Sequence, residues 1–262
     1  MKLAIQEHMG PWPSRMEKFR NFKKIGFGGV ELLGRGLAER KEEVKAALEE
    51  TGLAACTICT GYDDKILSAD PRERAAACAQ VRDLLKLAGE LKVGGLIFVP
   101  IFGPPRLQDL SPLKGAVELE KDLLVRILQD LAKVAEENCT MILLEPLNRY
   151  EAHLLNRLEQ GVEVAKRVNS PAVRIMADFF HMNIEEADIP KSIEAAGLWI
   201  QHVHLADNTR KQPGTGSTDF KSGFAALKKI GYGKYMALEC GFLGDVEKAI
   251  KESVKYLKGC MK

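Results

Sequence analysis

Short apolar segments alternate with longer amphipathic segments along the whole chain. The apolar segments are four to six residues long, too short for helices, and they predict eight strands, at 3–6, 29–33, 54–59, 95–99, 141–144, 173–177, 200–205 and 235–238. The segments between them predict eight helices, at 14–25, 38–51, 71–91, 117–137, 158–168, 184–196, 220–230 and 245–257. No linker or low-complexity segment interrupts the alternation, so we expect one domain over residues 1–262.

Residues that cap helices support several of these boundaries. Ser14 is a typical N-cap residue, and Asp70 before Pro71 combines an N-cap with a proline at the first helical position. Gly52 follows its helix at the position where a left-handed glycine commonly ends one. The segment from Pro100 to Pro112 contains no such signal and predicts a long irregular loop, which in a compact domain is usually functional or disordered.

Eight strand and helix units in 262 residues predict an α/β protein with a single (β/α)₈ TIM barrel. An open, doubly wound parallel sheet is built from the same unit and remains the alternative. Two observations favour closure: the strand count is eight, and the polar residues at strand ends are spread over the last four strands. No G-x-G-x-x-G motif follows the first strand, so the signature of a dinucleotide site is missing.

Four of the apolar segments end on an ionisable residue. These residues are Glu145, Asp178, His204 and Glu239, separated by 33, 26 and 35 residues, about one strand and one helix each. In a closed parallel barrel the carboxyl ends of the strands converge on one mouth, so the four side chains would meet there. A carboxylate beside a dry core is costly unless a cation faces it, so either a basic side chain or a metal ion is implied.

The residue types of this set indicate which ion would fit. Three carboxylates and one imidazole offer mostly hard oxygen donors, which suit Mn²⁺, Mg²⁺ or Co²⁺ better than a thiolate-type zinc site. The alternative is that each acid pairs separately with a helix. His202 has the same strand parity as His204 but lies deeper, which favours a hydrogen-bonded interior histidine, and the pattern does not decide which way Glu31 faces.

Further polar residues follow the same strand ends and predict a site for a polyhydroxylated ligand. They are Asn148, Arg149, Glu151, His181, Asp207, Asn208 and Arg210. Ordinary solvated loop remains the alternative, most readily for Arg149 and Lys211. The P-G-T-G-S segment at 213–217 could cradle a phosphate or act as a lid hinge. Asp245, a predicted N-cap, would repel a phosphate, which favours an unphosphorylated substrate.

Composition excludes several classes of protein. The net charge of +2 comes from 38 basic and 36 acidic residues, which gives no electrostatic case for nucleic acid or an anionic membrane. No apolar run approaches a membrane span of about 20 residues, and the N-terminal segment lacks a secretory pattern, so we expect a cytoplasmic protein. Cys56 and Cys59 have redox spacing, but they lie in a predicted strand, which favours core packing.

The motifs E-P-L-N-R-Y-E, A-D-F-F-H-M-N, H-V-H-L-A-D-N-T-R and P-G-T-G together resemble a known family. They look like the xylose isomerase-like sugar isomerase and epimerase barrels, most closely the D-tagatose 3-epimerase (ketose 3-epimerase) group. The resemblance is close over residues 140–240 and rests on strand and helix rhythm elsewhere. This chain departs from the pattern at Ser217, where histidine is common, and it carries Glu7 and His8 after the first strand, where members vary.

This resemblance implies roles for particular residues. The positions matching Glu145, Asp178, His204 and Glu239 bind one divalent metal ion per chain in that group, usually Mn²⁺ or Co²⁺. Those matching Glu145 and Glu239 are also the catalytic acid/base pair, and those matching Glu151, His181 and Arg210 hold the ketose. The implied activity is metal-dependent epimerisation of a free ketose at C3 through an enediolate. The implied assembly is a homo-oligomer, a dimer or a tetramer.

Several other activities use the same parts. An aldose-ketose or hydroxypyruvate-type isomerase, a keto-sugar-acid epimerase with Arg210 or Arg149 at the carboxylate, and a dehydratase of an inosose-type polyol remain alternatives. A non-catalytic sugar-binding barrel would keep the polar rim without needing both glutamates. The related barrels that repair abasic DNA carry extra histidines after strands three and four, where this chain has T-G-Y-D and V-P-I-F. Binding to DNA would also favour an excess of basic over acidic residues, which this chain does not have.

Overall fold

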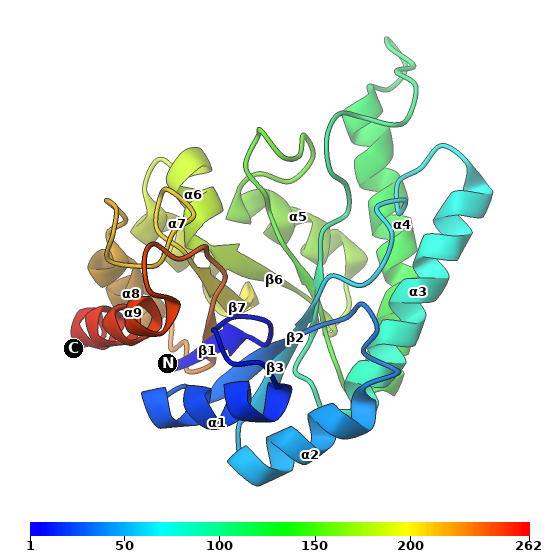
Figure 1. Ribbon diagram of the computed structural model, residues 1–262. Helices are drawn as coiled ribbons and strands as arrows, with labels where there is room; N and C mark the ends of the chain where they lie inside the picture. Colours follow the sequence, from blue (N-terminus) through cyan, green and yellow to red (C-terminus); the bar gives the residue numbers. More distant parts are fainter.

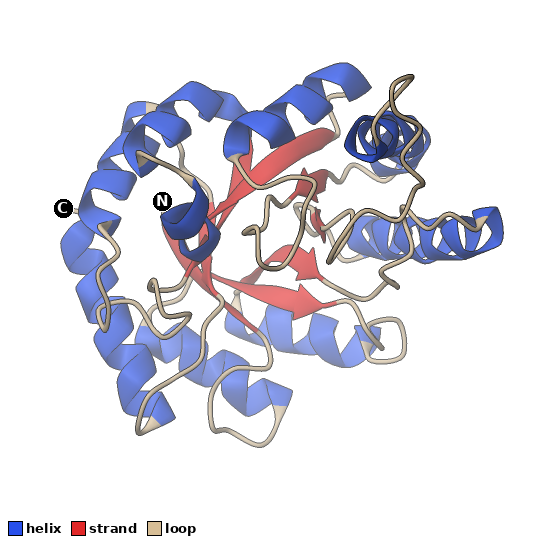
Figure 2. Ribbon diagram, turned by 90° about the horizontal axis from the view of Figure 1, so that it is seen from above, coloured by secondary structure: helices blue, strands red, loops and turns tan.

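The computed structural model describes residues 1–262 and contains eight parallel strands that close into a barrel inside a ring of helices (Figures 1 and 2). The strands are β1 (Lys2–Gln6), β2 (Gly29–Leu33), β3 (Ala54–Cys59), β4 (Leu96–Phe98), β5 (Ile142–Leu144), β6 (Val173–Asp178), β7 (Ile200–Leu205) and β8 (Tyr235–Leu238). The barrel closes where β1 pairs with β8, with Lys2 opposite Tyr235 and Ile5 opposite Leu238. The predicted (β/α)₈ barrel is therefore confirmed.

The helices surround this barrel and bury their apolar faces against it (Figure 2). They are α1 (Arg15–Ile25), α2 (Lys41–Thr51), α3 (Pro71–Glu90), α4 (Ala116–Glu137), α5 (Leu158–Val168), α6 (Phe179–Glu185), α7 (Ile189–Ala196), α8 (Phe220–Lys229) and α9 (Val246–Cys260). Ser14 and Asp70 cap α1 and α3 as predicted, and Gly52 ends α2 in the left-handed conformation. None of the helices combines the length and the apolar composition that crossing a membrane requires.

The helix predicted at 184–196 is wrong in its extent, because the structure divides this region into α6 and α7. Asp178 starts α6 directly at the end of β6, where its side chain accepts a hydrogen bond from the Phe180 N–H at 2.7 Å. Asp188 starts α7 by accepting the Lys191 N–H at 3.0 Å, and Pro190 lies in the first turn of α7. Two separate N-caps thus replace one continuous helix.

The helix predicted at 38–51 begins three residues later, at Lys41. Arg40 occupies the position before it, and its guanidinium bonds Glu7 at 2.7 Å and the Leu33 carbonyl. Glu7 also pairs with Arg15 at 3.0 Å, so this buried carboxylate ties together the loops after β1 and β2. The connection between β4 and α4 is irregular, as predicted, and extends beyond the other loops in Figure 1. Cys56 and Cys59 are buried free thiols, which confirms their packing role.

Candidate metal centre and active site

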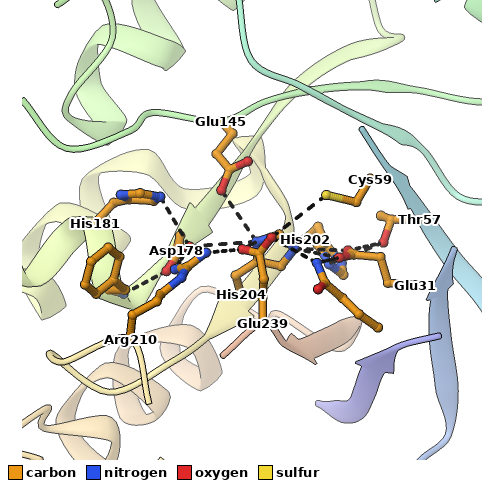
Figure 3. Close-up of polar contacts among 12 residues, drawn as sticks. Glu31, Thr57, Cys59, Glu145, Asp178, His181, His202, His204, Arg210 and Glu239 are labelled. Atoms are coloured by element: carbon orange, nitrogen blue, oxygen red, sulfur yellow. Dashed lines mark hydrogen bonds and ion pairs between the residues drawn. The ribbon is translucent and has the colours of Figure 1, made fainter. Parts of the chain in front are cut away.

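The four strand-end residues converge at the carboxyl-terminal mouth of the barrel (Figure 3). One potential ligand atom from each of Glu145, Asp178, His204 and Glu239 lies within 4.8 Å of every other. Glu145 and Glu239 directly follow β5 and β8, whereas Asp178 ends β6 and His204 lies in β7. The parallel strands therefore bring together residues that are 94 positions apart in the sequence, from 145 to 239.

His204 is the centre of this cluster and is fully buried. Its Nε2 atom lies 3.0 Å from both carboxylate oxygens of Glu31, so this nitrogen carries the proton. Its Nδ1 atom is enclosed and makes no hydrogen bond, although a Glu239 oxygen lies 2.8 Å away. An imidazole nitrogen with a free lone pair, held by a carboxylate on the opposite ring nitrogen, is the usual arrangement of a metal-ligating histidine.

The electrostatics of the cluster also favour a cation. Burial, reinforced by the charges of Glu239 and Asp178, raises the pKa of Glu145 despite the opposing effect of His204. Burial would lower the pKa of His204, but the charges of Glu239 and Glu31 raise it well above its usual value, so without an ion the ring favours a second proton on Nδ1, the position that an ion would take. Three carboxylate oxygens and one imidazole nitrogen thus form a site with excess negative charge that a divalent ion would neutralise. The residues present fit such an ion.

Glu31 is the residue of this site that the sequence did not place. Its carboxylate is completely buried and accepts hydrogen bonds from Gln6 Nε2 at 2.8 Å, Thr57 Oγ1 at 2.6 Å and His202 Nε2 at 2.9 Å. Burial would raise the pKa of Glu31, but the charge of His204 and the hydrogen bonds from both histidines hold it well below its usual range. Figure 3 shows Glu31 on the side of His204 opposite Asp178.

A signal for Glu31 was present in the sequence. A charged residue in the middle of an otherwise apolar strand needs a buried partner, and His202, correctly predicted as an interior hydrogen-bonded histidine, is that partner. Gln6 was a second signal, because it is a polar residue that ends the apolar strand β1. Its Nε2 atom also reaches Glu239 Oε1, at 2.9 Å, and so links Glu31 to the candidate base.

A cavity of about 230 Å³ lies beside the cluster and is lined by both predicted acid/base residues and by three of the predicted substrate residues, Glu151, His181 and Arg210. The other polar residues expected at this site, Asn148, Arg149, Asp207 and Asn208, do not line it. Its polar side consists of Glu145, Glu151, His181, Arg210 and Glu239. The opposite side is mostly apolar and comes from β3, β4 and the loops that follow them. Its members include Cys59, Tyr62, Ile97, Val99 and Phe102, which the sequence did not single out.

His181 is buried and its orientation is fixed by Asn148. The Asn148 backbone N–H donates to His181 Nδ1 at 3.1 Å, so Nδ1 is an acceptor and the ring proton is on Nε2. Nε2 lies 3.6 Å from Asp178 Oδ2, at the edge of the cluster. His181 can therefore donate a hydrogen bond to an oxygen in the cavity. Glu151 is more exposed, and its carboxylate accepts from Asn148 Nδ2 at 2.8 Å.

Arg210 bonds two members of the cluster directly. Its guanidinium lies 2.5 Å from Asp178 Oδ2 and also contacts the Glu239 carboxylate. The Phe180 ring packs 4.7 Å beneath it. Arg210 has a left-handed backbone with a φ of 56°, which is uncommon outside glycine and is held here by the surrounding loop. Its predicted contact with a sugar stays a prediction.

The segment at 213–217 is closed by Asp207 rather than open to a ligand. Asp207 Oδ2 accepts the backbone N–H groups of Gly214, Thr215 and Gly216 at 2.8–3.1 Å. The Ser217 N–H is bound by Asn208 Oδ1 at 2.9 Å. These amides are therefore not available to a phosphate, and the cradle considered from the sequence is wrong. Arg149 is exposed and pairs with Glu185 at 2.9 Å.

Comparisons with known proteins agree with this geometry. A family model described as a xylose isomerase-like TIM barrel matches residues 19–260. A 3-dehydro-D-guloside 4-epimerase from Escherichia coli K12 is 34% identical over 99% of this chain and 100% of its own. A D-psicose 3-epimerase from Ruminiclostridium cellulolyticum is 33% identical over 82% and 74% of the two chains. The crystal structure of an E. coli 3-keto-D-glucoside 4-epimerase matches with a TM-score of 0.90 and 32% identity, over 99% and 100%.

Proposed function

The chain belongs to the xylose isomerase-like TIM barrel family and is a carbohydrate epimerase, and from this premise we propose that it inverts the carbinol carbon next to the ketone of a keto sugar with Glu145 and Glu239 as the acid/base pair. One observation carries the proposal. Two glutamates, the buried Glu145 after β5 and the partly exposed Glu239 after β8, line one cavity of sugar size beside a single cluster of candidate ligands.

The chemistry requires a proton acceptor on one face of the carbon and a proton donor on the other. Glu145 and Glu239 are both within the cavity, and each follows a strand of the rigid barrel, so their positions are fixed before a sugar binds. Gln6 donates a hydrogen bond to Glu239 Oε1 at 2.9 Å and so restrains the direction of its carboxylate. Removal of the proton from one face and its return on the other invert the carbon.

We propose that Glu145, Asp178, His204 and Glu239 hold one divalent ion, with Mn²⁺ first and Co²⁺ or Mg²⁺ as alternatives. When bound, the ion would supply positive charge beside the sugar oxygens on which negative charge develops as the proton leaves. The unpartnered Nδ1 atom of His204 and the oxygen-rich donor set support this assignment.

The remaining polar residues of the cavity would hold the sugar. His181 presents Nε2–H to the cavity, Glu151 presents a carboxylate that accepts from hydroxyl groups, and Arg210 presents a cation. The apolar wall with Tyr62 and Phe102 would pack against the less polar face of the sugar ring and keep water from the reacting carbon.

For the reacting carbon we place C4 of a 3-keto glycoside first. The relative with 4-epimerase activity on a 3-dehydro-guloside matches over the whole of both chains. Ser217, which departs from the ketose-epimerase pattern, is compatible with this choice. Phe102 supports it further, since this ring is 45% exposed at the edge of the cavity, where the group attached to the sugar would extend.

The second candidate is the reaction expected from the sequence, epimerisation of a free ketose at C3. The 33% identity to a D-psicose 3-epimerase supports it. The chemistry is the same, because in both substrates the inverted carbon is next to a ketone. What differs is the sugar carbon that lies between the two glutamates.

Deuterium exchange distinguishes these possibilities. The protein is incubated with Mn²⁺ in D₂O, separately with methyl 3-keto-glucoside and with D-fructose, and the products are examined by NMR. Inversion with label at C4 of the glycoside supports the first candidate, and inversion with label at C3 of the ketose supports the second. Label at C1 with an aldose product indicates an isomerase, and loss of water indicates a dehydratase.

Substitution of the glutamates tests the acid/base pair. Glu145→Gln and Glu239→Gln each keep one oxygen for an ion but remove the exchangeable carboxyl proton. Each should lose epimerisation by roughly 10²- to 10⁴-fold, the usual contribution of a general acid or base. Lys221→Gln, an exposed substitution on α8, is the control and should keep full activity. Activity within tenfold of the unmodified protein in either glutamate variant would exclude the proposed pair.

A further inference from the structure

A second cavity, of about 350 Å³, lies at the opposite, amino-terminal mouth of the barrel. Three lysines line it: Lys2 opens β1, Lys234 directly precedes β8, and Lys92 lies between α3 and β4. Because β4 is four strands from β8 around the barrel, the lysines approach the cavity from opposite sides. No aspartate or glutamate is among the lining residues.

The positive charge of these lysines is not neutralised within the protein. None of the three takes part in any ion pair of the structure, which contains many ion pairs between other residues. Lys234 contacts the side-chain oxygen of Gln201, and Lys2 lies 5.3 Å from the centre of the Tyr235 ring. Burial and the nearby charge of Arg174 lower the pKa of Lys234, and no carboxylate opposes them.

A buried histidine forms part of the wall of the same cavity. His202 is only 1% exposed, yet it lines the cavity. Its Nε2 atom is bound to Glu31 at 2.9 Å inside the barrel, which leaves Nδ1 as the ring nitrogen without a hydrogen-bond partner. Because Glu31 holds the proton on Nε2, Nδ1 is available as an acceptor for a hydroxyl group.

Small side chains make the space for a ligand here. Cys56 lines the cavity and packs against Ala4 and Ala237 in a separate small cluster, whereas barrel interiors usually contain bulky branched residues in such layers. Gly94 and Gly233 add backbone without side chains to the rim. The cavity is therefore larger than the active-site cavity although no candidate acid or base reaches it.

We propose that this amino-terminal cavity binds a hydroxylated oxyanion, either inorganic phosphate or a phosphate monoester. The phosphoryl oxygens would accept hydrogen bonds from Lys2, Lys92 and Lys234, and the P–OH group would donate to His202 Nδ1. Sulfate is also a tetrahedral anion, but it has no hydroxyl group at neutral pH. It therefore cannot donate a hydrogen bond to His202 Nδ1. The site is separate from the proposed active site and does not depend on the reaction catalysed there.

The test is calorimetric titration of the full-length, Mg²⁺-loaded protein with inorganic phosphate. Lys92→Asn and Lys234→Gln remove one charge each. Asparagine suits the left-handed backbone of Lys92, whose φ is 54°, and glutamine preserves a polar group beside Gln201. Each variant should raise the Kd about tenfold or more, as expected for loss of a charge-assisted hydrogen bond. Lys221→Gln, which removes an exposed lysine that does not line this cavity, should leave the Kd unchanged.

Three results would overturn the proposal. The first is no saturable binding of phosphate to the unmodified protein. The second is a Kd unaffected by Lys92→Asn and Lys234→Gln but greatly raised by Arg210→Ala, which would place phosphate at the metal centre. The third is equal affinity for sulfate, which would exclude the hydroxyl contact with His202. Glycerol phosphate, titrated in parallel, distinguishes the two proposed ligands. Tighter binding than inorganic phosphate indicates that the site takes a phosphate monoester, and weaker binding indicates that it takes the free ion.

Discussion

Replacement of Glu31 by glutamine should weaken binding of the divalent ion although Glu31 is not itself a proposed ligand. Glu31 accepts five contacts of 2.6–3.0 Å, from Gln6, Thr57, His202 and twice from His204. A glutamine keeps one acceptor oxygen, and its amide group would face at least one of these donors. The proton of His204 would then be free to move to Nδ1, which lies 2.8 Å from Glu239 Oε2, and so block the lone pair that the ion needs.

The expected size of the effect follows from this geometry. Loss of a partner behind a metal-ligating histidine typically lowers affinity by 10- to 100-fold, or about 1.4 to 2.7 kcal/mol. Affinity for Mn²⁺ is measured by competition with a chromophoric chelator, with the fold checked by circular dichroism. His204→Ala sets the upper limit, since it removes a ligand and should abolish stoichiometric binding.

Glu120→Gln is the matched control for the loss of a buried carboxylate. Glu120 is fully buried on α4, outside the barrel, and bonds His153 and the Leu107 N–H at 2.5 and 3.1 Å. This variant should lose thermal stability and keep its affinity for Mn²⁺. An unchanged Mn²⁺ affinity in Glu31→Gln would refute the orienting role of Glu31, and stoichiometric Mn²⁺ in His204→Ala would refute the metal site itself.

Two further predictions concern substrate binding and pH. His181→Ala should keep Mn²⁺ and raise KM about two- to tenfold, the usual loss for one hydrogen bond, and steady-state kinetics with an unchanged KM would contradict its contact with the sugar. Burial would raise the pKa of Asp207, but the backbone N–H groups of Thr218, Gly216 and Asn208 outweigh it and lower that pKa. The stabilisation is therefore complete above the unfolded pKa of about 4 and is lost as pH falls through the lower folded value. Thermal unfolding should show Asp207→Asn less stable than the unmodified protein at pH 7, with the difference shrinking below about pH 4, and a difference independent of pH would refute this account.

The elements that the sequence predicted well are those with local signals. The strand ends at Glu145, Asp178, His204 and Glu239 could be found because a polar residue directly after a short apolar run is visible without any tertiary information. The division between α6 and α7 was missed although Asp188, the N-cap of α7, and Pro190, in its first turn, were both visible in the sequence. Local capping was the stronger signal there.

The apolar wall of the active-site cavity could not be predicted in the same way. The Tyr62 hydroxyl accepts the Val99 N–H at 2.8 Å, so the loop after β3 is positioned by the loop after β4. Arg106, in the connection after β4, similarly bonds the Asp64 carboxylate in the loop after β3. Such contacts join residues that are 37 and 42 positions apart, and no local pattern in either loop indicates the other.

The two sides of the active-site cavity have different origins, and this matters for changing the enzyme. The charged side comes from Glu145 and Glu239, which directly follow β5 and β8, and from residues of the segments after β5, β6 and β7. The apolar side comes from β3, β4 and their loops, with Phe102 on the long connection that projects from the molecule in Figure 1. Directed evolution confined to residues 60–64 and 99–107 would therefore change the apolar side of the cavity and leave the proposed acid/base pair unaltered, and loops grafted from relatives would test whether sugar selectivity moves with them.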